Sequence, residues 1–272
     1  MLDKYPQLQR MRILPWAITI LAFLFLYAPI VVLVIYSFNA SSRVAIWGGW
    51  STKWYAELLH NQDVLTAALK SLQIALSSAT IGTIIGLLGA YALIRLGRFW
   101  SRPILSATLA APLVMPEVIT GISMLLLFIA MEQFVGWPNG RGMLTIIIAH
   151  STFCAAYVSI IIMSRLRNVD RSIEEAALDL GAKPYHVFMD VTFPAIATAI
   201  LSGWLLAFTL SLDDLVIASF VSGPSSSTLP MLIFSKVRFG VSPEINALAS
   251  LVILIVSLSL ATAWFLQSRN KH

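Results

Sequence analysis

Long apolar runs, separated by short polar segments, occupy most of the chain. Six of them approach or exceed the roughly 20 residues that a helix needs to cross the hydrocarbon core of a bilayer. None alternates apolar and polar residues as the strands of membrane barrels do, and backbone groups cannot stay unpaired in lipid. The pattern predicts an all-α integral membrane protein, a single domain over residues 1–272, with six transmembrane helices at residues 14–38, 71–94, 103–131, 142–164, 194–212 and 245–266.

The composition agrees with lipid as the main solvent of this chain. Of its 272 residues, 58% are hydrophobic and only 11% are charged, whereas soluble domains are usually about 25% charged. The single cysteine, Cys154, excludes a disulfide within the chain. Trp47, Trp50 and Trp54 in the segment 39–70 predict a helix that lies at the outer membrane interface, where aromatic side chains gather.

The basic residues are divided unevenly between the two sides of the predicted helices. If the N-terminus is cytoplasmic, that side receives twelve of the 18 lysines and arginines, namely Lys4, Arg10, Arg12, Arg95, Arg98, Arg102, Arg165, Arg167, Arg171, Lys183, Arg269 and Lys271. Because positive residues are enriched in cytoplasmic loops, we expect both termini on the inside. The net charge of +5 is then an orientation signal, and we expect no nucleic-acid partner.

The longest predicted cytoplasmic loop, residues 165–194, carries clear helix signals. Ser172 and Glu175 fit a capping box at the start of a short helix, with Ser172 as the N-cap. Gly181 is typical of a helix end, and Pro184 is typical of the first turn of a second helix. The loop therefore predicts a compact helix-turn-helix that closes where the fifth transmembrane helix begins, at Pro194.

The sequence of this loop resembles a known family signature. Glu175-Ala176-Ala177, three residues, Gly181, nine residues and Val191-x-Phe193-Pro194 are similar to the pattern of binding-protein-dependent ABC importer permeases. In that family the pattern reads Glu-Ala-Ala, three residues, Gly, nine residues, Ile-x-Leu-Pro, so Val191 and Phe193 are departures at its two aliphatic positions. The resemblance covers the right loop of a protein with six predicted spans, and it implies a type I ABC importer permease fold.

The resemblance also implies a mechanism. In the family this coupling loop docks on a separate ATPase subunit, and ATP-driven movement of that subunit rocks the membrane helices. The chain contains no G-x-x-x-x-G-K-[ST] phosphate loop, so we expect it to bind no cofactor while the partner uses ATP and Mg²⁺. The resemblance assigns the ATPase contact to Glu174, Glu175, Ala176, Ala177, Gly181, Ala182, Pro184, Phe188 and Pro194.

Similarity to the permeases of putrescine and spermidine importers extends over essentially the whole chain. It is carried by Leu26-Tyr27-Ala28-Pro29, by Phe208-Thr209-Leu210-Ser211-Leu212-Asp213-Asp214 and by Gly240-Val241-Ser242-Pro243-Glu244. Trp137-Pro138 and Arg141-Gly142-Met143 are similar to the putrescine branch. Membership of that branch implies a polyamine substrate, a heterodimer with a sister permease, two ATPase subunits, a periplasmic substrate-binding protein and a place in the bacterial inner membrane.

Three carboxylates are candidates for a polyamine pathway, because a cation needs carboxylates or aromatic faces and not a basic lining. Glu117 lies about 21 Å along the third predicted span, and Asp213 and Asp214 follow about 28 Å of the fifth. Alternatively, Glu117 pairs with the sister subunit, and the two aspartates cap helix ends. His150 is expected at a solvated outer helix end.

The residues also bear on rival functions. An intramembrane enzyme would need a nucleophile and a base brought together, but the chain has no G-x-S-x-G and no H-E-x-x-H motif. An ABC permease for another solute, such as a sugar, an oxyanion or ferric iron, would carry the same coupling loop. An oxyanion carrier would be expected to place Lys or Arg in the pathway, and neither residue interrupts the six predicted spans.

Overall fold

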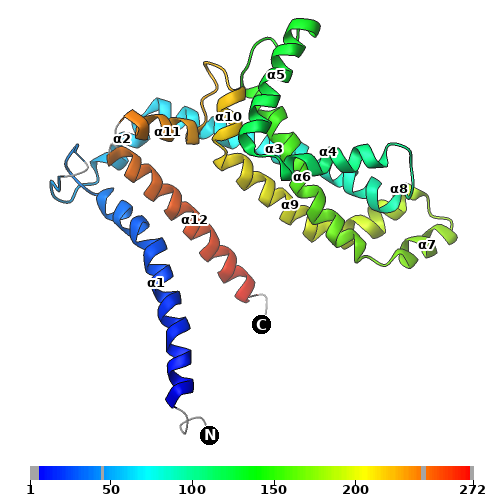
Figure 1. Ribbon diagram of the computed structural model, residues 1–272, viewed down its shortest axis with the longest axis horizontal. Helices are drawn as coiled ribbons and strands as arrows, with labels where there is room; N and C mark the ends of the chain where they lie inside the picture. Colours follow the sequence, from blue (N-terminus) through cyan, green and yellow to red (C-terminus); the bar gives the residue numbers. More distant parts are fainter. Residues whose placement is uncertain (1–5, 44–45, 240–242, 270–272) are drawn as a thin grey trace. The chain divides into compact units, whose positions relative to one another are not determined.

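The computed structural model describes residues 6–43, 46–239 and 243–269, and every regular element in these ranges is a helix (Figure 1). The chain divides into two compact units. The first comprises Met1–Leu65 and Ile233–His272, and the second comprises Thr66–Leu232.

The first unit contains α1 (Pro6–Tyr36), α2 (Lys53–His60) and α12 (Pro243–Arg269), and α12 contacts both other helices. Its α1–α2 loop is organised by Asn39, whose Nδ2 donates to the Ile46 carbonyl at 2.8 Å while its Oδ1 accepts from the Gly48 amide at 2.8 Å. Of the helix expected in the tryptophan-rich segment, α2 is present and contains Trp54, whereas Trp47 and Trp50 lie in the loop before it. Its place at a membrane interface stays a prediction. Along α1, the side chains from residue 15 to residue 35 are mostly exposed and apolar, as expected where lipid or another protein chain covers a helix.

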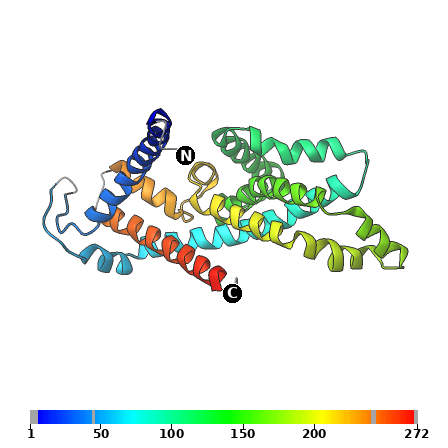
Figure 2. The same ribbon diagram turned by 90° about the horizontal axis from the view of Figure 1, so that it is seen from below.

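The second unit is a bundle around α6 (Met143–Arg167), which runs beside α9 (Phe193–Asp213) in both views (Figures 1 and 2). Most of α3 (Gln62–Arg95) belongs to the same unit. The core between these helices is made of fully buried aliphatic side chains, among them Ala79, Val158, Ile162, Leu166, Ile196 and Ala207.

Small residues allow α3 and α6 to approach closely. A Cβ atom built on Gly86 would lie 2.8 Å from the Ala155 carbonyl oxygen, and one on Gly82 would lie 2.8 Å from Cβ of Cys154. Glycines four residues apart are a common device where membrane helices associate, because van der Waals contact there replaces the hydrophobic drive available in water.

The third apolar run is not one helix, so the expected continuous span over 103–131 is wrong. It is divided into α4 (Arg102–Val114) and α5 (Glu117–Val135), which meet at an extended Met115 with φ −81° and ψ 136°. Met115 precedes Pro116, whose ring disfavours helical geometry in the residue before it. With 13 residues, α4 is only about 20 Å long, shorter than the bilayer core of about 30 Å.

Among the described residues, five helices are long and apolar enough to cross a membrane: Pro15–Tyr36, Gln62–Arg95, Glu117–Val135, Met143–Arg167 and Pro184–Asp213. The predicted first, second, fourth and fifth spans are confirmed as helices. The sixth falls on α12, whose described apolar part, Pro243–Ile255, is shorter. Two further helices, α10 (Val216–Val221) and α11 (Leu229–Phe239), lie in the connection before α12 and were not expected.

We predict that Gly86→Leu lowers the thermal unfolding midpoint of the detergent-solubilised protein. The new side chain has to displace backbone atoms of α6, and overpacking of this kind costs about 1–3 kcal/mol. The matched control is Gly89→Ala, because a Cβ on Gly89 would meet only the end of the Leu109 side chain. Equal midpoints for Gly86→Leu and the native protein would contradict the close approach of α3 and α6.

Candidate functional site

The polar loop after α6 folds into α7 (Arg171–Asp179), and its N-cap differs from the expected one. Asp170 is the cap, since its Oδ1 accepts from the Ser172 amide at 2.9 Å. This hydrogen bond holds the pKa of the Asp170 carboxyl below its ordinary value. Ser172 lies inside the helix, and Glu175 pairs with Arg171, Nε to Oε1, at 3.2 Å. The capping box centred on Ser172 is therefore wrong, because an aspartate two residues earlier already satisfies the first turn.

The end of α7 confirms the role predicted for Gly181. The glycine has φ +87°, its amide donates to the Leu178 carbonyl at 2.9 Å, and the Ala182 amide donates to the Ala177 carbonyl at 3.1 Å. This pair of bonds is the Schellman arrangement, in which the left-handed residue lets the chain turn back on its own helix. A side chain at Gly181 would meet open space, so backbone conformation, and not crowding within this chain, selects glycine.

The second helix of the loop begins at Pro184 as expected, but it does not stop before the fifth span. α8 (Pro184–His186) passes into a π-helical segment, η1 (Val187–Thr192), and then directly into α9. The Phe193 amide donates to the Phe188 carbonyl, five residues back. Such a widened turn accommodates Pro194, which lacks an amide hydrogen and would crowd the preceding turn of a regular helix. Pro194 therefore lies inside a continuous helix and does not close the loop.

A buried polar network joins the loop to the membrane helices. Nε of Arg95, the last residue of α3, lies 2.9 Å and 3.2 Å from the two carboxylate oxygens of Glu174 on α7. Thr192, at the end of η1, donates its hydroxyl to Glu174 at 2.9 Å, and Arg95 Nη2 donates to the Val169 carbonyl at 3.2 Å. The Arg95 and Glu174 side chains are only 9% and 10% exposed. Sequence reasoning missed Arg95 and Thr192 because they lie 79 and 18 residues from Glu174.

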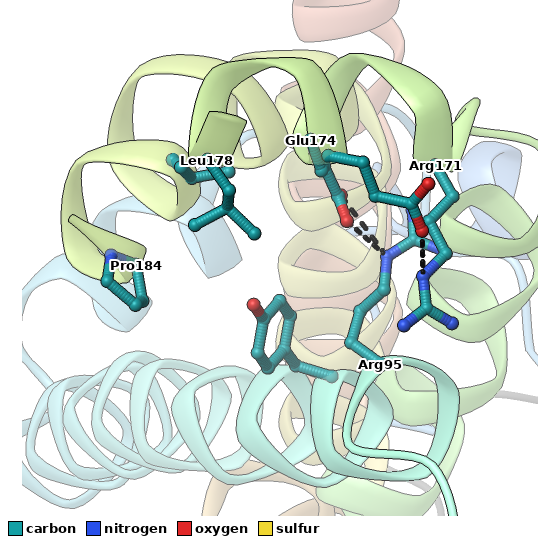
Figure 3. Close-up of a pocket in the computed structure, with 8 residues that line it drawn as sticks. Arg95, Arg171, Glu174, Leu178 and Pro184 are labelled. Carbon is teal, nitrogen blue, oxygen red and sulfur yellow. Dashed lines mark hydrogen bonds and ion pairs between the residues drawn. The ribbon is translucent and has the colours of Figure 1, made fainter. Parts of the chain in front are cut away.

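Beside this network lies a cavity of about 160 Å³ (Figure 3). Tyr91 and Arg95 of α3 line one side, and Leu178 of α7, Pro184 and Val187 line the other. In Figure 3, Arg95 reaches from α3 to Glu174, while Leu178 and Pro184 stand across the open space. The packing between α7 and α3 is therefore incomplete where the two elements face each other.

The residues expected to contact an ATPase differ in how exposed their side chains are. Glu175, Ala176, Gly181, Pro184 and Pro194 are exposed, while Ala177 and Ala182 are half-buried. Glu174 is instead engaged in the buried network. Phe188 packs edge-on against Tyr91 with ring centroids 5.1 Å apart.

Several apolar side chains of the loop that sequence reasoning did not assign to this surface are also exposed, and Leu180 and Tyr185 are the most exposed of them. Leu180 is 89% exposed and Tyr185 is 64% exposed. Leu180 directly precedes Gly181 at the end of α7. A large apolar residue at such an end is the signal that would have marked it as a contact residue.

The candidate pathway aspartates have different environments. Asp213 ends α9 and is exposed. Asp214 turns inward: its Oδ2 lies 3.1 Å from Nε2 of His150 and accepts from the Ala218 amide at 2.8 Å. Its Oδ1 accepts from the Ile217 amide at 3.3 Å. Asp214 thus caps the start of α10, in line with the helix-capping alternative, and His150 is its hydrogen-bonding partner.

His150 is fully buried, so its expected place at a solvated helix end is wrong. Its Nδ1 is 2.7 Å from Ser211 Oγ, and it joins α6 to α9 and α10. The trio contains the residue types of a catalytic triad, but Ser211 is only 4% exposed, so no substrate carbonyl can reach its hydroxyl. The cluster links α6 to α9 and to the start of α10 by hydrogen bonds, and the spacing of these residues in the sequence does not predict it.

Glu117, the third candidate, is exposed in the first turn of α5, directly after Pro116. A carboxylate is favourable at this end of a helix because the first amides have no partners within the helix. Nothing within the described chain pairs with it, so a pathway role and a contact with a sister subunit both stay predictions.

Comparison with known proteins places this geometry in a family. Residues 78–269 match the model of the binding-protein-dependent transport system inner membrane component. The chain is 58% identical over 257 residues to the putrescine transport system permease protein PotI of Escherichia coli (strain K12), covering 94% of this chain and 92% of that protein. It is 41% identical over 247 residues to the spermidine/putrescine transport system permease protein PotC of the same strain, covering 91% and 90%.

Solved structures support the same fold. A chain of a bacterial ABC transporter involved in the import of the acidic polysaccharide alginate superposes with a TM-score of 0.72 at 18% identity, covering 97% of this chain and 98% of that chain. A chain of an amino acid ABC transporter gives 0.58 at 19% identity, covering 80% and 98%. The fold is that of a type I ABC importer permease. Both the sequence and the fold therefore show that this multi-pass membrane protein belongs to the family of inner membrane components of binding-protein-dependent transport systems.

Proposed function

We propose that the chain is one permease subunit of an ATP-driven importer of polyamines, with putrescine as the cargo. The observation that carries the proposal is 58% identity to a putrescine permease over nearly the full length of both chains. The chain forms half of the translocation pathway, beside a sister permease. A periplasmic binding protein delivers the cargo, and two ATPase subunits drive its passage through a bacterial inner membrane, with both termini of the chain on the cytoplasmic side.

The surface of the coupling loop fits a docking role. Leu180 and Tyr185 offer exposed apolar area on the same loop as the exposed, acidic Glu175. Exposed apolar area is unfavourable in water alone and suits contact with another protein. Because the Schellman turn and the buried network fix the loop, these side chains are presented by a rigid element. A rigid contact loses less conformational entropy when it binds.

Of the two aspartates, Asp213 is the better choice for contact with a polyamine. Its side chain is exposed and carries a charge opposite to that of an ammonium group. Asp214 supports the helix start beside it, through its contacts with His150 and with the Ile217 and Ala218 amides.

The cargo is tested with the chain reconstituted in liposomes together with its sister permease, ATPases and binding protein. ATP hydrolysis is measured while putrescine, spermidine, a sugar and sulfate are offered in turn. We expect putrescine to stimulate hydrolysis most strongly. Stimulation by another solute with no response to putrescine would overturn the cargo assignment and leave the importer architecture intact.

We predict that Gly181→Val abolishes uptake without preventing membrane insertion, whereas Gly181→Asn retains most uptake. The left-handed conformation costs a residue with a side chain about 1–2 kcal/mol, and asparagine tolerates it better than a β-branched residue does. Uptake by the two variants and their level in isolated membranes are compared. Equal loss of uptake in both would mean that the partner requires the bare glycine surface and that the turn is not the reason for glycine.

We predict that Asp213→Asn raises the putrescine concentration for half-maximal uptake about tenfold, the equivalent of about 1.4 kcal/mol, with an unchanged thermal midpoint. Asp214→Ala should instead lower the midpoint, because it leaves His150 and two amides without their acceptor, at about 1–3 kcal/mol for an unsatisfied buried group. Unchanged uptake in Asp213→Asn would remove this carboxylate from the pathway.

A further inference from the structure

Three segments meet at one carboxylate on the cytoplasmic loop. Glu174 of α7 contacts Arg95 at the end of α3 and Thr192 at the end of η1, immediately before α9. Glu174 is 8% exposed, and Thr192 is fully buried. The adjacent acid behaves differently, because the Arg171–Glu175 pair has side chains that are 61% and 63% exposed. Exposed pairs of that kind contribute little.

The network lies where apolar packing is weak. The cavity of about 160 Å³ lies between Leu178 of α7 and Tyr91 of α3. The two helices therefore lack direct packing contact along that stretch. A displaced α7 could slide into this space if only apolar contacts held it, since the dispersion contacts that resist sliding are missing where a void lies. The Arg95–Glu174–Thr192 contacts bridge α7 and the membrane helices at the edge of the void.

The geometry of these contacts makes the bridge stiff. The Arg95 Nε–H donates to Glu174 Oε1 at 3.2 Å and lies 2.9 Å from Oε2, and Arg95 Nη2 donates to the Val169 carbonyl. Charged hydrogen bonds of this type are directional and strong. Breaking a buried ion pair leaves an unpaired charge, which is strongly unfavourable. A shift of α7 therefore has to carry α3 and the start of α9 with it.

We propose that Glu174 is the positioning residue through which movement of α7 passes to α3 and α9. This inference rests on the proposed function and adds a transmission point to it. The acid does not touch the ATPase; it ties the docked loop to the helices that must move. Without the tie, α7 still presents Glu175 and Leu180 to the ATPase, but its displacement is taken up by the cavity. The complex then hydrolyses ATP with little transport.

The test uses the complete complex in liposomes, with putrescine uptake and ATP hydrolysis followed in the same vesicles. The variants are Glu174→Gln, Glu174→Asp and Thr192→Val, and the matched control is Asp190→Asn. Asp190 is an exposed acid in the same η1 segment for which the described structure shows no hydrogen bond or ion pair. The measured quantity is putrescine moved per ATP hydrolysed.

We expect Glu174→Gln to lower this ratio at least about tenfold, while complex assembly and ATP hydrolysis persist. Glu174→Asp keeps the charge on a shorter arm and should recover part of the ratio. Thr192→Val, a neutral change of similar shape, should lower it a few-fold, and Asp190→Asn should match the native complex.

Two results would overturn the inference. One is a native ratio in both Glu174→Gln and Thr192→Val. The other is equal loss of assembly, hydrolysis and uptake in these two variants, which would assign the network to folding or docking. If the native complex responds to a different solute, the ratio is measured with that solute, so that the cargo assignment and the transmission role fail separately.

Discussion

The buried ion pair between Arg95 and Glu174 is the constraint on which the cytoplasmic end of this protein depends. Two charges removed from water are tolerated when hydrogen bonds replace those to water, and here Thr192 donates to Glu174 while the Val169 carbonyl accepts from Arg95. Because these partners belong to different segments, satisfying one carboxylate fixes α7 against the end of α3 and against the π-helical turn before α9. The polar loop is thereby joined to the membrane bundle at this carboxylate.

Neighbouring acids take opposite roles at both candidate sites. Glu174 is buried in an ion pair with Arg95, while Glu175 is exposed. Asp214 contacts His150 and caps the start of α10, while Asp213 is exposed. In each pair the inward residue supplies the geometry and the outward residue is exposed to a partner or a cation, although Glu175 also pairs with Arg171 on its own helix. This division explains how a chain with 11% charged residues can both order its polar segments and keep charges for function. It also separates the effects that substitution of each acid should have.

Most of the fold followed from the sequence because long apolar runs leave helices as the only solution in lipid. Gly181 and Pro184 were placed correctly because their local backbone chemistry is decisive. The errors have physical causes of two kinds. Two errors come from neighbouring residues. The third span is not continuous because Pro116 ends the helix before it, and Ser172 is not the N-cap because Asp170 already fills that position. The environments of His150 and Glu174 were not predicted because their partners are distant in sequence. His150 contacts Ser211 and Asp214, which lie 61 and 64 residues away, and Glu174 contacts Arg95. The pattern of neighbouring residues does not predict such long-range contacts.

The distance between α7 and the end of α3 during ATP turnover is the direct test of the role proposed for Glu174. The sole cysteine, Cys154, is buried and can be replaced by alanine, and spin labels can be placed at Leu96→Cys and Asp179→Cys, both exposed positions. Electron dipolar spectroscopy is then recorded on the full complex with and without ATP. We expect one narrow distance distribution that is the same in both states, and a broadened distribution when Glu174→Gln is added. A distribution that shifts with ATP in the complex with Glu174 intact would contradict this role, because α7 would then move independently of α3.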